Sequence, residues 1–406
     1  MRCRHCHSSS LHTFLDLGFS PPSNAYLSEA DLKKPEKYFP LKVMVCDQCW
    51  LAQTEDFVCA SELFSADYAY FSSTSSSWLE HAQQYASQIV KRLVLDETNL
   101  VIEVASNDGY LLKNFVDAGI PSLGIEPTES TAIVAESAGV PVIREFFGEA
   151  LGKKLASEDR RADLIVGNNV YAHVPDINDF TKGLKAALKP NGTITLEFPH
   201  LMRLLERAQF DTIYHEHFSY LSLYAVNAIF AEVGLRVWDV EELATHGGSL
   251  RIYGCHSTDE RASTEAVQVL LDEETRRGMQ TLKPYTEFQW RVERIKNDLL
   301  EFLLEQKSSG KAVVAYGAAA KGNTLLNYAG VKPDLLPFVS DAAVAKQNKY
   351  MPGSHIPILS PAEIVKAQPA YVLILPWNIA EEVKSQLAQD LPSAQFVTAV
   401  PELKVQ

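Results

Sequence analysis

Short apolar runs alternate with stretches of helical periodicity over residues 100–254. Each run has the length of a buried strand, and in the stretch that follows it apolar residues recur with the spacing of a helix face. Strands and helices that alternate in this way are typical of a doubly wound parallel sheet, which binds ligands at the carboxyl ends of its strands. The expected strands lie in NLVIEV, SLGI, VPVI, ADLIV and GTITLEF, and the expected helices in 111–118, 133–138 and 180–188.

A second series of the same kind predicts a smaller α/β domain at the end of the chain. Its strands are expected in KAVVAY, LLPFVS, YVLIL and QFVTAV. Residues 259–306 are charged and helically periodic without a strand signal, so they predict a helical connector. We therefore expect an amino-terminal module over 1–66, a first α/β domain over 67–256, the connector over 257–306 and a second α/β domain over 307–406.

Composition and charge narrow the class of protein. The chain has 406 residues, 46% of them hydrophobic, which is enough for two to three folded units and argues against disorder. Its formal net charge of −14 argues against a broadly basic surface for nucleic acid or anionic membrane. The first residues, MRCRHCHSSS, contain no apolar signal segment, and no later run is long enough to span a bilayer. We expect a cytoplasmic protein that binds neither nucleic acid nor membrane.

Four of the six cysteines lie within the first 49 residues, as two CxxC pairs. Each pair can present two thiolates from one turn, and two such turns complete a tetrahedral site for a structural zinc ion. Disulfides are not expected in the cytoplasm. A redox dithiol is the alternative, and His5 or His7 could replace one cysteine as a ligand. The expected ligands are Cys3, Cys6, Cys46 and Cys49.

The first strand of the central domain leads into a turn that is suited to a nucleoside cofactor. Backbone N–H groups at such a turn face the ligand, and Glu126, at the end of the next strand, can accept hydrogen bonds from ribose hydroxyls. The turn lacks the GxGxxG pattern of dinucleotide sites, which favours a cofactor without phosphates. A strand-end charge and a turn residue are the structural alternatives. The expected cofactor-binding residues here are Glu103, Ala105, Asn107, Asp108, Gly109, Glu126 and Asn168.

Residues 64–77 are rich in aromatic and hydroxyl side chains, and two interpretations of them stay open. The serines could cap the helix that follows. Alternatively Tyr68, Tyr70 and Ser72 could line the cofactor pocket, because tyrosine offers both a flat face and a hydroxyl.

Several motifs together resemble a known family. EVASNDG, ADLIVGNNVYAHVPD and LKPNGTITLEFP stand where class I S-adenosylmethionine methyltransferases have their motifs, although the first has fewer glycines. With the CxxC pairs, DYAYFSSTSSSW, FDTIYHEHFSYLSL and YGAAAKGNTLLN, the whole chain resembles the nucleotide-sugar C-methyltransferases that act on 4-keto-deoxysugars. The resemblance implies a zinc-binding module, a central class I (Rossmann-like) methyltransferase domain and a Rossmann-like α/β domain that holds the nucleotide.

The densest group of ionisable side chains is Tyr214-His215-Glu216-His217. Carbon methylation next to a ketone requires a base that removes a carbon-bound proton and donors that face the ketone oxygen. We expect His217 to be the base, because an unperturbed histidine can be neutral at pH 7. Glu216 would orient it or a substrate hydroxyl, and Tyr214 is the alternative base or an enolate donor. On an extended segment His215 and His217 would face the same side, whereas a tight turn would mix the faces. A metal site and a purely structural polar corner are the alternatives.

Further polar residues follow predicted strands and open onto the same crevice. His173 is expected to face the substrate in catalysis, as the resemblance implies. In the carboxyl-terminal domain the turn GAAAKGN suits the nucleotide diphosphate, and KQNKYMPGSHIPI is either a loop that closes over the ligand or an exposed basic loop. The expected substrate-binding residues are Asn169, Glu197, His200, His215, Lys321, Asn323, Asp341, Lys346, Tyr350 and His355.

Three functions compete at this point. The first is methylation of carbon, most often C3 in the family, on a TDP- or GDP-linked 4-keto-deoxysugar, by a monomer. The second is an RNA or protein methyltransferase whose zinc module recognises the macromolecule. The third is a non-catalytic nucleotide-sugar-binding protein, which the reduced glycine content of the first motif suggests.

Overall fold

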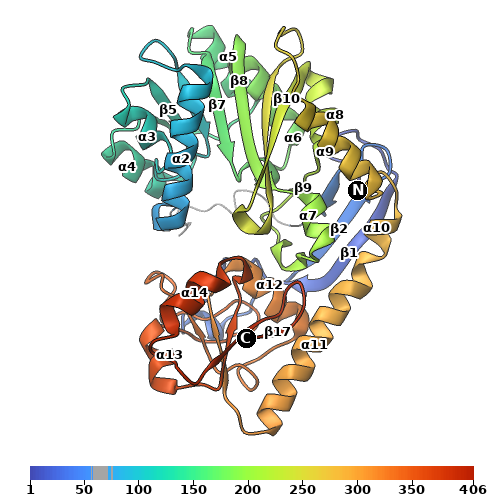
Figure 1. Ribbon diagram of the computed structural model, residues 1–406, viewed down its shortest axis with the longest axis vertical. Coiled ribbons are helices and arrows are strands. Elements are labelled where there is room, and N and C mark those ends of the chain that lie inside the picture. The colour runs from blue at the N-terminus through green and yellow to red at the C-terminus, as the bar shows by residue number, and fades with distance from the viewer. Residues whose placement is uncertain (56, 58–71, 75) are drawn as a thin grey trace.

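The computed structural model describes residues 1–55, 57, 72–74 and 76–406. They form three sheets, and helix α11 (Phe288–Ser308) runs from the upper unit to the lower one along one side of the molecule (Figure 1). The α/β class and the expected sheets of both α/β units are observed.

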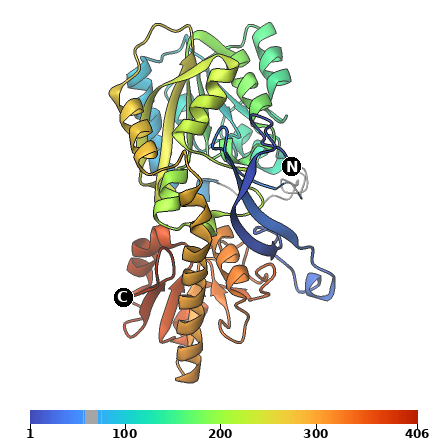
Figure 2. The same ribbon diagram turned by 90° about the vertical axis from the view of Figure 1, so that its right-hand side faces the viewer.

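The amino-terminal sheet is antiparallel and has the order β1-β2-β3-β9. Its fourth strand comes from the middle of the chain and pairs with β3, so residues outside the expected module of 1–66 complete this sheet. Figure 2 shows the sheet beside the junction of the two larger units. The strands are β1 (Leu11–Ser20), β2 (Phe39–Cys46), β3 (Ala52–Thr54) and β9 (Ser219–Tyr220).

The central sheet has the order β10-β11-β8-β7-β4-β5-β6, with parallel pairing from β8 to β6 and antiparallel pairing of β11 with both neighbours. Helices cover both faces, which is why the inner strands are mostly apolar rather than strictly alternating. The strands are β4 (Val101–Val104), β5 (Ser122–Ile125), β6 (Val142–Ile143), β7 (Ala162–Asn168), β8 (Leu188–Pro199), β10 (Leu235–Leu243) and β11 (Ser249–His256). The helices are α2 (Ser76–Leu93), α3 (Leu112–Asp117), α4 (Glu129–Ser137), α5 (Glu149–Ser157), α6 (Ile177–Ala187), α7 (Leu201–Glu206) and α8 (Leu223–Val233).

The carboxyl-terminal sheet has the order β14-β13-β12-β15-β16-β17, parallel except for β17. Its strands are β12 (Val313–Tyr316), β13 (Val339–Ser340), β14 (Ile358–Leu359), β15 (Tyr371–Ile374), β16 (Gln395–Thr398) and β17 (Lys404–Val405). Its helices are α12 (Ala320–Ala329), α13 (Pro361–Ala367) and α14 (Ala380–Leu387).

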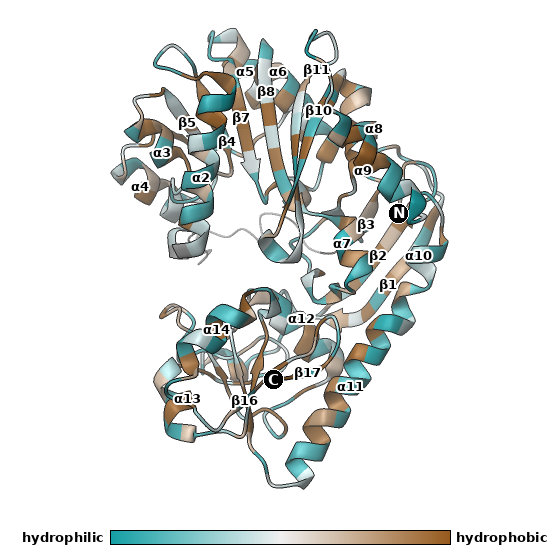
Figure 3. Cartoon of the chain, in the orientation of Figure 1, coloured by the Kyte–Doolittle hydropathy of each residue, from teal (hydrophilic) through white to brown (hydrophobic). Residues whose placement is uncertain are grey.

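The helical connector packs on the amino-terminal sheet and is therefore not surrounded by solvent on all sides. Phe14 of β1 contacts the rings of Tyr285 and Phe288 at centroid distances of 5.2 and 5.1 Å. Apolar and polar residues alternate around α11 while the inner strands of the central sheet are mostly apolar (Figure 3). The connector comprises α9 (Glu265–Arg276), α10 (Lys283–Thr286) and α11.

Within the described part of the chain, no helix combines the length and the apolar character needed to cross a membrane.

Candidate active site

The four amino-terminal cysteines converge on one point. Their sulfur atoms all lie within 4.8 Å of one another, with Cys3 and Cys49 3.4 Å apart and Cys6 and Cys46 3.5 Å apart. Four thiolates around a tetrahedral zinc ion are about 3.8 Å apart, given a Zn–S bond of about 2.3 Å. The donor set therefore fits zinc. His5 is not among these ligands, because its Nδ1 contacts Asn178 Oδ1 at 3.0 Å.

The turn after β4 has the backbone shape that a tightly bound cofactor requires. Ala105 and Asn107 adopt positive φ angles of 57° and 49°, and Gly109 one of 78°. A Cβ atom on Gly109 would lie 3.1 Å from Ala135 of α4, so this position combines an unusual φ with a close approach. The turn is held by Glu126, whose carboxylate accepts hydrogen bonds of 2.9 Å from the N–H groups of Asn107 and Thr128.

Three acidic side chains meet at this turn, which bears on the kind of cofactor it can hold. Glu103, Asp108 and Glu126 are all buried, and burial together with the charges of the other two raises the pKa of Glu103 well above its usual value. Oε2 of Glu103 and both polar atoms of the Asn168 amide are buried without a hydrogen-bond partner among the described residues. This group attracts a cation with N–H and O–H donors and repels a diphosphate. The residues present fit S-adenosylmethionine, which is cationic and has ribose hydroxyls.

The segment before α2 docks on the same turn. The backbone N–H of Ser72 donates to Asn107 Oδ1 at 2.9 Å, and that of Ser73 donates to Asp108 Oδ2 at 3.0 Å. The structure therefore places Ser72 beside the turn after β4, and its expected part in a cofactor pocket stays a prediction. Tyr68 and Tyr70 lie outside the described residues.

The Tyr214-His217 segment is a tight turn and not an extended strand. The N–H of His217 donates to the Tyr214 carbonyl at 3.0 Å. The faces are therefore mixed. The ring centroids of Tyr214 and His217 lie 4.1 Å apart, whereas His215 turns away toward Phe39 and donates its Nε2–H to the Pro40 carbonyl at 3.2 Å. The structure separates His215 from His217.

His217 is held in one tautomer. Its Nδ1–H donates to the Thr212 carbonyl at 2.8 Å, which leaves Nε2 to accept a proton. The ring of His173, in the short helix η3 (Tyr171–His173), lies 4.6 Å away. Burial lowers the pKa of His173 to about 4. Burial, together with the neighbouring His173, His246 and Lys321, lowers the pKa of His217 well below its usual value. Both imidazoles are neutral at pH 7.

Side chains from the other two sheets hold this turn in place. From the amino-terminal module, Asn24 Nδ2 donates to Glu216 Oε1 at 2.7 Å, and Thr54 Oγ1 donates to the His217 carbonyl at 3.0 Å. From α12 of the carboxyl-terminal unit, Thr324 Oγ1 donates to the Ile213 carbonyl at 2.9 Å. The turn is thus where the three units meet.

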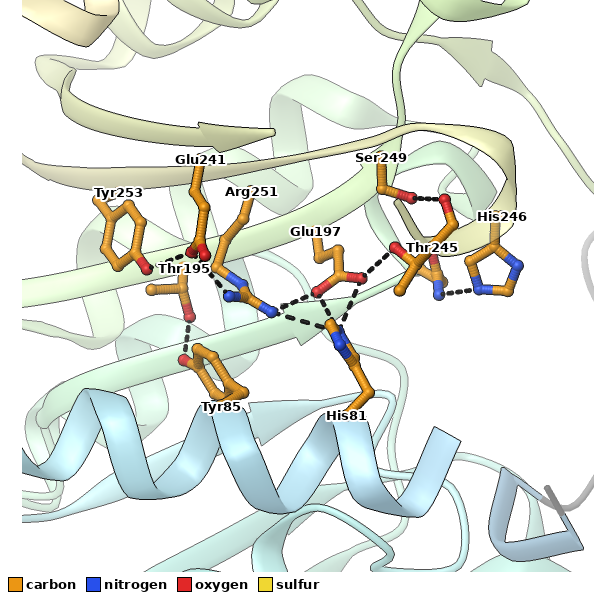
Figure 4. Close-up of polar contacts among 11 residues, drawn as sticks. His81, Tyr85, Thr195, Glu197, Glu241, Thr245, His246, Ser249, Arg251 and Tyr253 are labelled. Carbon is orange, nitrogen blue, oxygen red and sulfur yellow. Dashed lines mark hydrogen bonds and ion pairs between the residues drawn. The ribbon is translucent and has the colours of Figure 1, made fainter. Parts of the chain in front are cut away.

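Two of the expected substrate residues are occupied by structural ion pairs. Glu197, fully buried in β8, accepts hydrogen bonds from Arg251, His81 and Thr245 at 2.7, 2.9 and 3.0 Å (Figure 4). Burial opposes its ionisation, but His81 and Arg251 hold its pKa below the usual value. His200 is buried against Glu274 of α9 at 2.7 Å. The structure does not bring His200 to the turn at His217.

A further hydrogen bond joins the end of β7 to the loop between β10 and β11. Nδ2 of Asn169, the residue after β7, lies 3.1 Å from Nε2 of His246 in η5 (Thr245–Gly247). Burial and the charge of Lys321 lower the pKa of His246 to about 4. Asn169 therefore donates to a neutral imidazole.

The expected substrate residues of the carboxyl-terminal unit divide into two groups. Lys321 and Asn323 lie at the start of α12: Lys321 Nζ donates to Asn378 Oδ1 at 2.6 Å, and Asn323 donates to the Ser23 carbonyl at 2.6 Å. Lys346 bridges Asp341, at 3.3 Å, and the carbonyl of Ala318 in the turn after β12, at 3.0 Å.

The other group consists of Tyr350 and His355 in the loop 346–358, which contacts the amino-terminal module. Tyr350 forms a backbone bridge to Leu27, and His355 Nε2 lies 2.9 Å from Glu36 Oε2. His355 is exposed and lies at the rim of this contact.

Four residues that the sequence analysis did not select lie in or next to the site: Asn24, Thr54, Asp211 and Trp377. Asn24 and Thr54 are far in sequence from the turn at Tyr214-His217 and carry no local motif. Asp211 lies inside FDTIYHEHF, and Trp377 comes two residues after the predicted strand YVLIL, so these positions were the signals that the sequence offered.

Three family models match successive parts of the chain. A family model described as a C-methyltransferase C-terminal domain matches residues 244–401, one described as a "Putative zinc binding domain" matches residues 3–64, and one described as a methyltransferase domain matches residues 78–240. Among solved structures, the PH0226 protein from Pyrococcus horikoshii OT3 is 16% identical and covers 50% of this chain and 100% of its own, with a TM-score of 0.38.

Two curated relatives differ in how much of the chain they match. An uncharacterized methyltransferase from Mycobacterium leprae is 30% identical over 99 residues, which are 24% of this chain and 36% of that protein. The C-methyltransferase NovU from Streptomyces niveus is 35% identical over 404 residues, which are 99% of this chain and 96% of that protein. Since this likeness extends over nearly the whole of both proteins and includes all three units, the chain belongs to the C-methyltransferase family.

Proposed function

We propose that this protein transfers the methyl group of S-adenosylmethionine to carbon, at C3, next to the ketone of a nucleoside-diphosphate-linked 4-keto-deoxysugar. The observation that carries the proposal is His217, a buried neutral imidazole of fixed tautomer beside His173 and Tyr214. It lies where the methyltransferase unit, the zinc-binding module and the carboxyl-terminal unit meet.

Methylation of carbon differs from methylation of nitrogen or oxygen in its need for a base. A carbon next to a ketone becomes nucleophilic only when its proton is removed, and the electrons of the broken C–H bond then move toward the ketone oxygen as an enolate. In our proposal His217 Nε2 receives that proton. The enolate carbon then forms a bond to the methyl group as the C–S bond breaks, and S-adenosylhomocysteine leaves.

The surrounding residues suit this step. The carbonyl of Thr212 holds the Nδ1–H of His217 and stabilises the imidazolium that forms. Tyr214 packs against the same ring, with the ring planes inclined by 34°, and would donate to the enolate oxygen or act as the base in place of His217. The Glu216 carboxylate, which accepts a hydrogen bond from Asn24, would also accept one from a substrate hydroxyl. His173 packs edge-on against the His217 ring and, being neutral, adds no charge to the site before the substrate binds.

S-adenosylmethionine supplies an electrophilic methyl group when bound. The acidic turn after β4 would hold it, with Glu126 toward the ribose and Glu103, Asp108 and Asn168 toward its cationic end. Ala105 and Gly109 allow the backbone to approach closely.

The carboxyl-terminal unit would hold the nucleotide. Its turn after β12, with Lys321 and Lys346 on either side, supplies the positive charge that an acidic protein must concentrate locally to bind a diphosphate. A TDP-sugar is our first choice and a GDP-sugar the second. A monomeric state and residence in the cytoplasm stay predictions.

The cysteine cluster predicts one tightly bound structural zinc ion per chain. Metal analysis of freshly purified protein should give about one equivalent, because four thiolates form a closed tetrahedral site. Cys46→Ser should lose the metal, whereas Cys255→Ser, which removes a buried thiol in β11 outside the cluster, should keep it. Less than about half an equivalent in the wild-type protein would contradict the assignment.

The acidic turn predicts that Glu126→Gln weakens binding of S-adenosylhomocysteine about tenfold, since a hydrogen bond to a charged acceptor is exchanged for one to a neutral group. Calorimetric titration measures the affinity. Glu129→Gln is the matched control, because Glu129 lies on α4 and pairs with Arg144 at the surface. Equal affinities of wild type and Glu126→Gln would exclude Glu126 from the cofactor site.

The base assignment predicts the effect of His217→Asn on proton exchange. A TDP-linked 4-keto-6-deoxyhexose incubated in D₂O with S-adenosylhomocysteine should gain deuterium at the carbon next to the ketone, as mass spectrometry reports. The variant should lose this exchange, because an Asn N–H can replace the bond to Thr212 but supplies no base. Exchange at the wild-type rate in His217→Asn would remove His217 from the role, and Tyr214→Phe then tests the alternative base. His256→Asn serves as the control.

The lowered pKa of His217 predicts the acid limb of the same exchange. A histidine of ordinary pKa would lose half its activity near pH 6.5. Since His217 stays neutral to lower pH, exchange should continue unchanged through pH 6.5 and fall only below it. Buried neutral histidines also reduce the stability of the folded state below their unfolded pKa, so circular dichroism must show folded protein at each pH. A midpoint at or above pH 6.5 would contradict the prediction.

A further inference from the structure

One indole side chain of the carboxyl-terminal unit touches the central unit at two places. Trp377, the first residue of η6 (Trp377–Ile379), donates its Nε1–H to Asp211 Oδ2 at 2.7 Å. Asp211 belongs to η4 (Phe210–Thr212), which leads directly into the catalytic turn. The other edge of the ring packs on Gly247, where an added Cβ would lie 2.2 Å from the ring. Trp377 is therefore locked against the central unit.

The same indole carries a cation on its face. Lys321 Nζ lies 4.8 Å from the Trp377 ring centroid, and its hydrogen bond to Asn378 fixes it there. Lys321 also lies one helical turn before Thr324, which holds the Ile213 carbonyl. The ammonium thus faces the junction of the two units, and its charge contributes to the low pKa of His217 after burial and His173.

Burying the Asp211 carboxylate at this place costs free energy. It is fully buried, and its Oδ1 has no hydrogen-bond partner in the part of the chain that the structure describes. Burial raises its pKa to about 6, although Lys321 and the Trp377 N–H oppose that rise. A neutral residue would be less costly to bury, so the carboxylate does not serve stability.

We propose, on the basis of the proposed function, that Asp211 and Trp377 are positioning residues that hold the Lys321 ammonium toward a negatively charged oxygen of the substrate. The carboxylate polarises the indole through its N–H, which enriches the ring face in electron density and strengthens its attraction for the cation. A lysine fixed in this way is preorganised, whereas a free lysine side chain would have to be ordered at each binding event. The oxygen belongs either to the diphosphate or to the enolate.

Three substitutions separate the parts of this arrangement. Lys321→Met removes the charge, Trp377→Phe keeps the ring but removes the N–H, and Asp211→Asn keeps an acceptor for the indole but removes the carboxylate charge. Trp290→Phe, an exposed tryptophan on α11, is the matched control. Two quantities are measured: the affinity for TDP alone by calorimetry, and deuterium exchange into a saturating TDP-linked 4-keto-6-deoxyhexose with S-adenosylhomocysteine present.

We expect Lys321→Met to lower one of the two quantities. If the oxygen belongs to the diphosphate, TDP affinity falls about tenfold. If it belongs to the enolate, TDP affinity is unchanged and exchange falls about a hundredfold. In either case Trp377→Phe and Asp211→Asn should lower the same quantity about tenfold. They should have no further effect in the Lys321→Met background, because they act through that charge. Asp211→Asn should also keep the Tm of the wild type, which a structural role for the carboxylate does not predict.

The proposal is overturned if Lys321→Met changes neither quantity, if the two positioning variants match the wild type within about twofold, or if their effects persist in full without Lys321. Failure of the proposed function is distinct. In that case the wild-type protein itself would neither bind TDP nor promote exchange, before any variant is compared.

Discussion

The short turn from Ile213 to Phe218 can stay buried only if its polar groups find partners, and no single unit of the protein supplies them. Thr54 and Asn24 come from the zinc-binding module, Thr324 from the carboxyl-terminal unit, and Thr212 from the central unit. A buried carbonyl without a partner costs free energy comparable to a lost hydrogen bond. The geometry of the candidate catalytic group therefore depends on the correct docking of all three units.

This constraint gives the cysteine cluster a role in the site although it is far from any reacting atom. A closed metal site would tie together two turns at one end of the amino-terminal sheet, where the start of β1 pairs with the end of β2. That sheet includes β9, which directly follows the turn from Ile213 to Phe218. The segment that carries Asn24 then reaches across to α12, where Asn323 holds the Ser23 carbonyl. The zinc-binding module thus contacts both the central and the carboxyl-terminal unit and joins them. Recognition of a macromolecule is not needed to explain the position of the module.

Acidic groups and lysines gather at two separate turns, which suit two different ligands. The turn after β4 gathers three buried carboxyl groups, which favour a cation, whereas Lys321 and Lys346 lie beside the carboxyl-terminal sheet, where a diphosphate would bind. Between them the histidines are buried and neutral. An acidic protein can thus accept an anionic substrate, because the local field and not the net charge of −14 decides what binds at each end.

The sequence by itself determined what depends on local pattern. Periodicity predicted the parallel parts of both α/β sheets but not their antiparallel edge strands β10, β11 and β17. The CxxC spacing predicted the cysteine cluster, and the position of Glu126 at a strand end placed it beside the turn after β4. Only the tertiary structure decided the direction of His215, the pairing of His200 with Glu274, and the arrival of β9 in the amino-terminal sheet. It also brought Trp377 to Asp211, 166 residues away. Strand and helix periods depend on neighbouring residues, whereas these contacts depend on how separately formed units dock, and docking leaves no periodic trace in the chain.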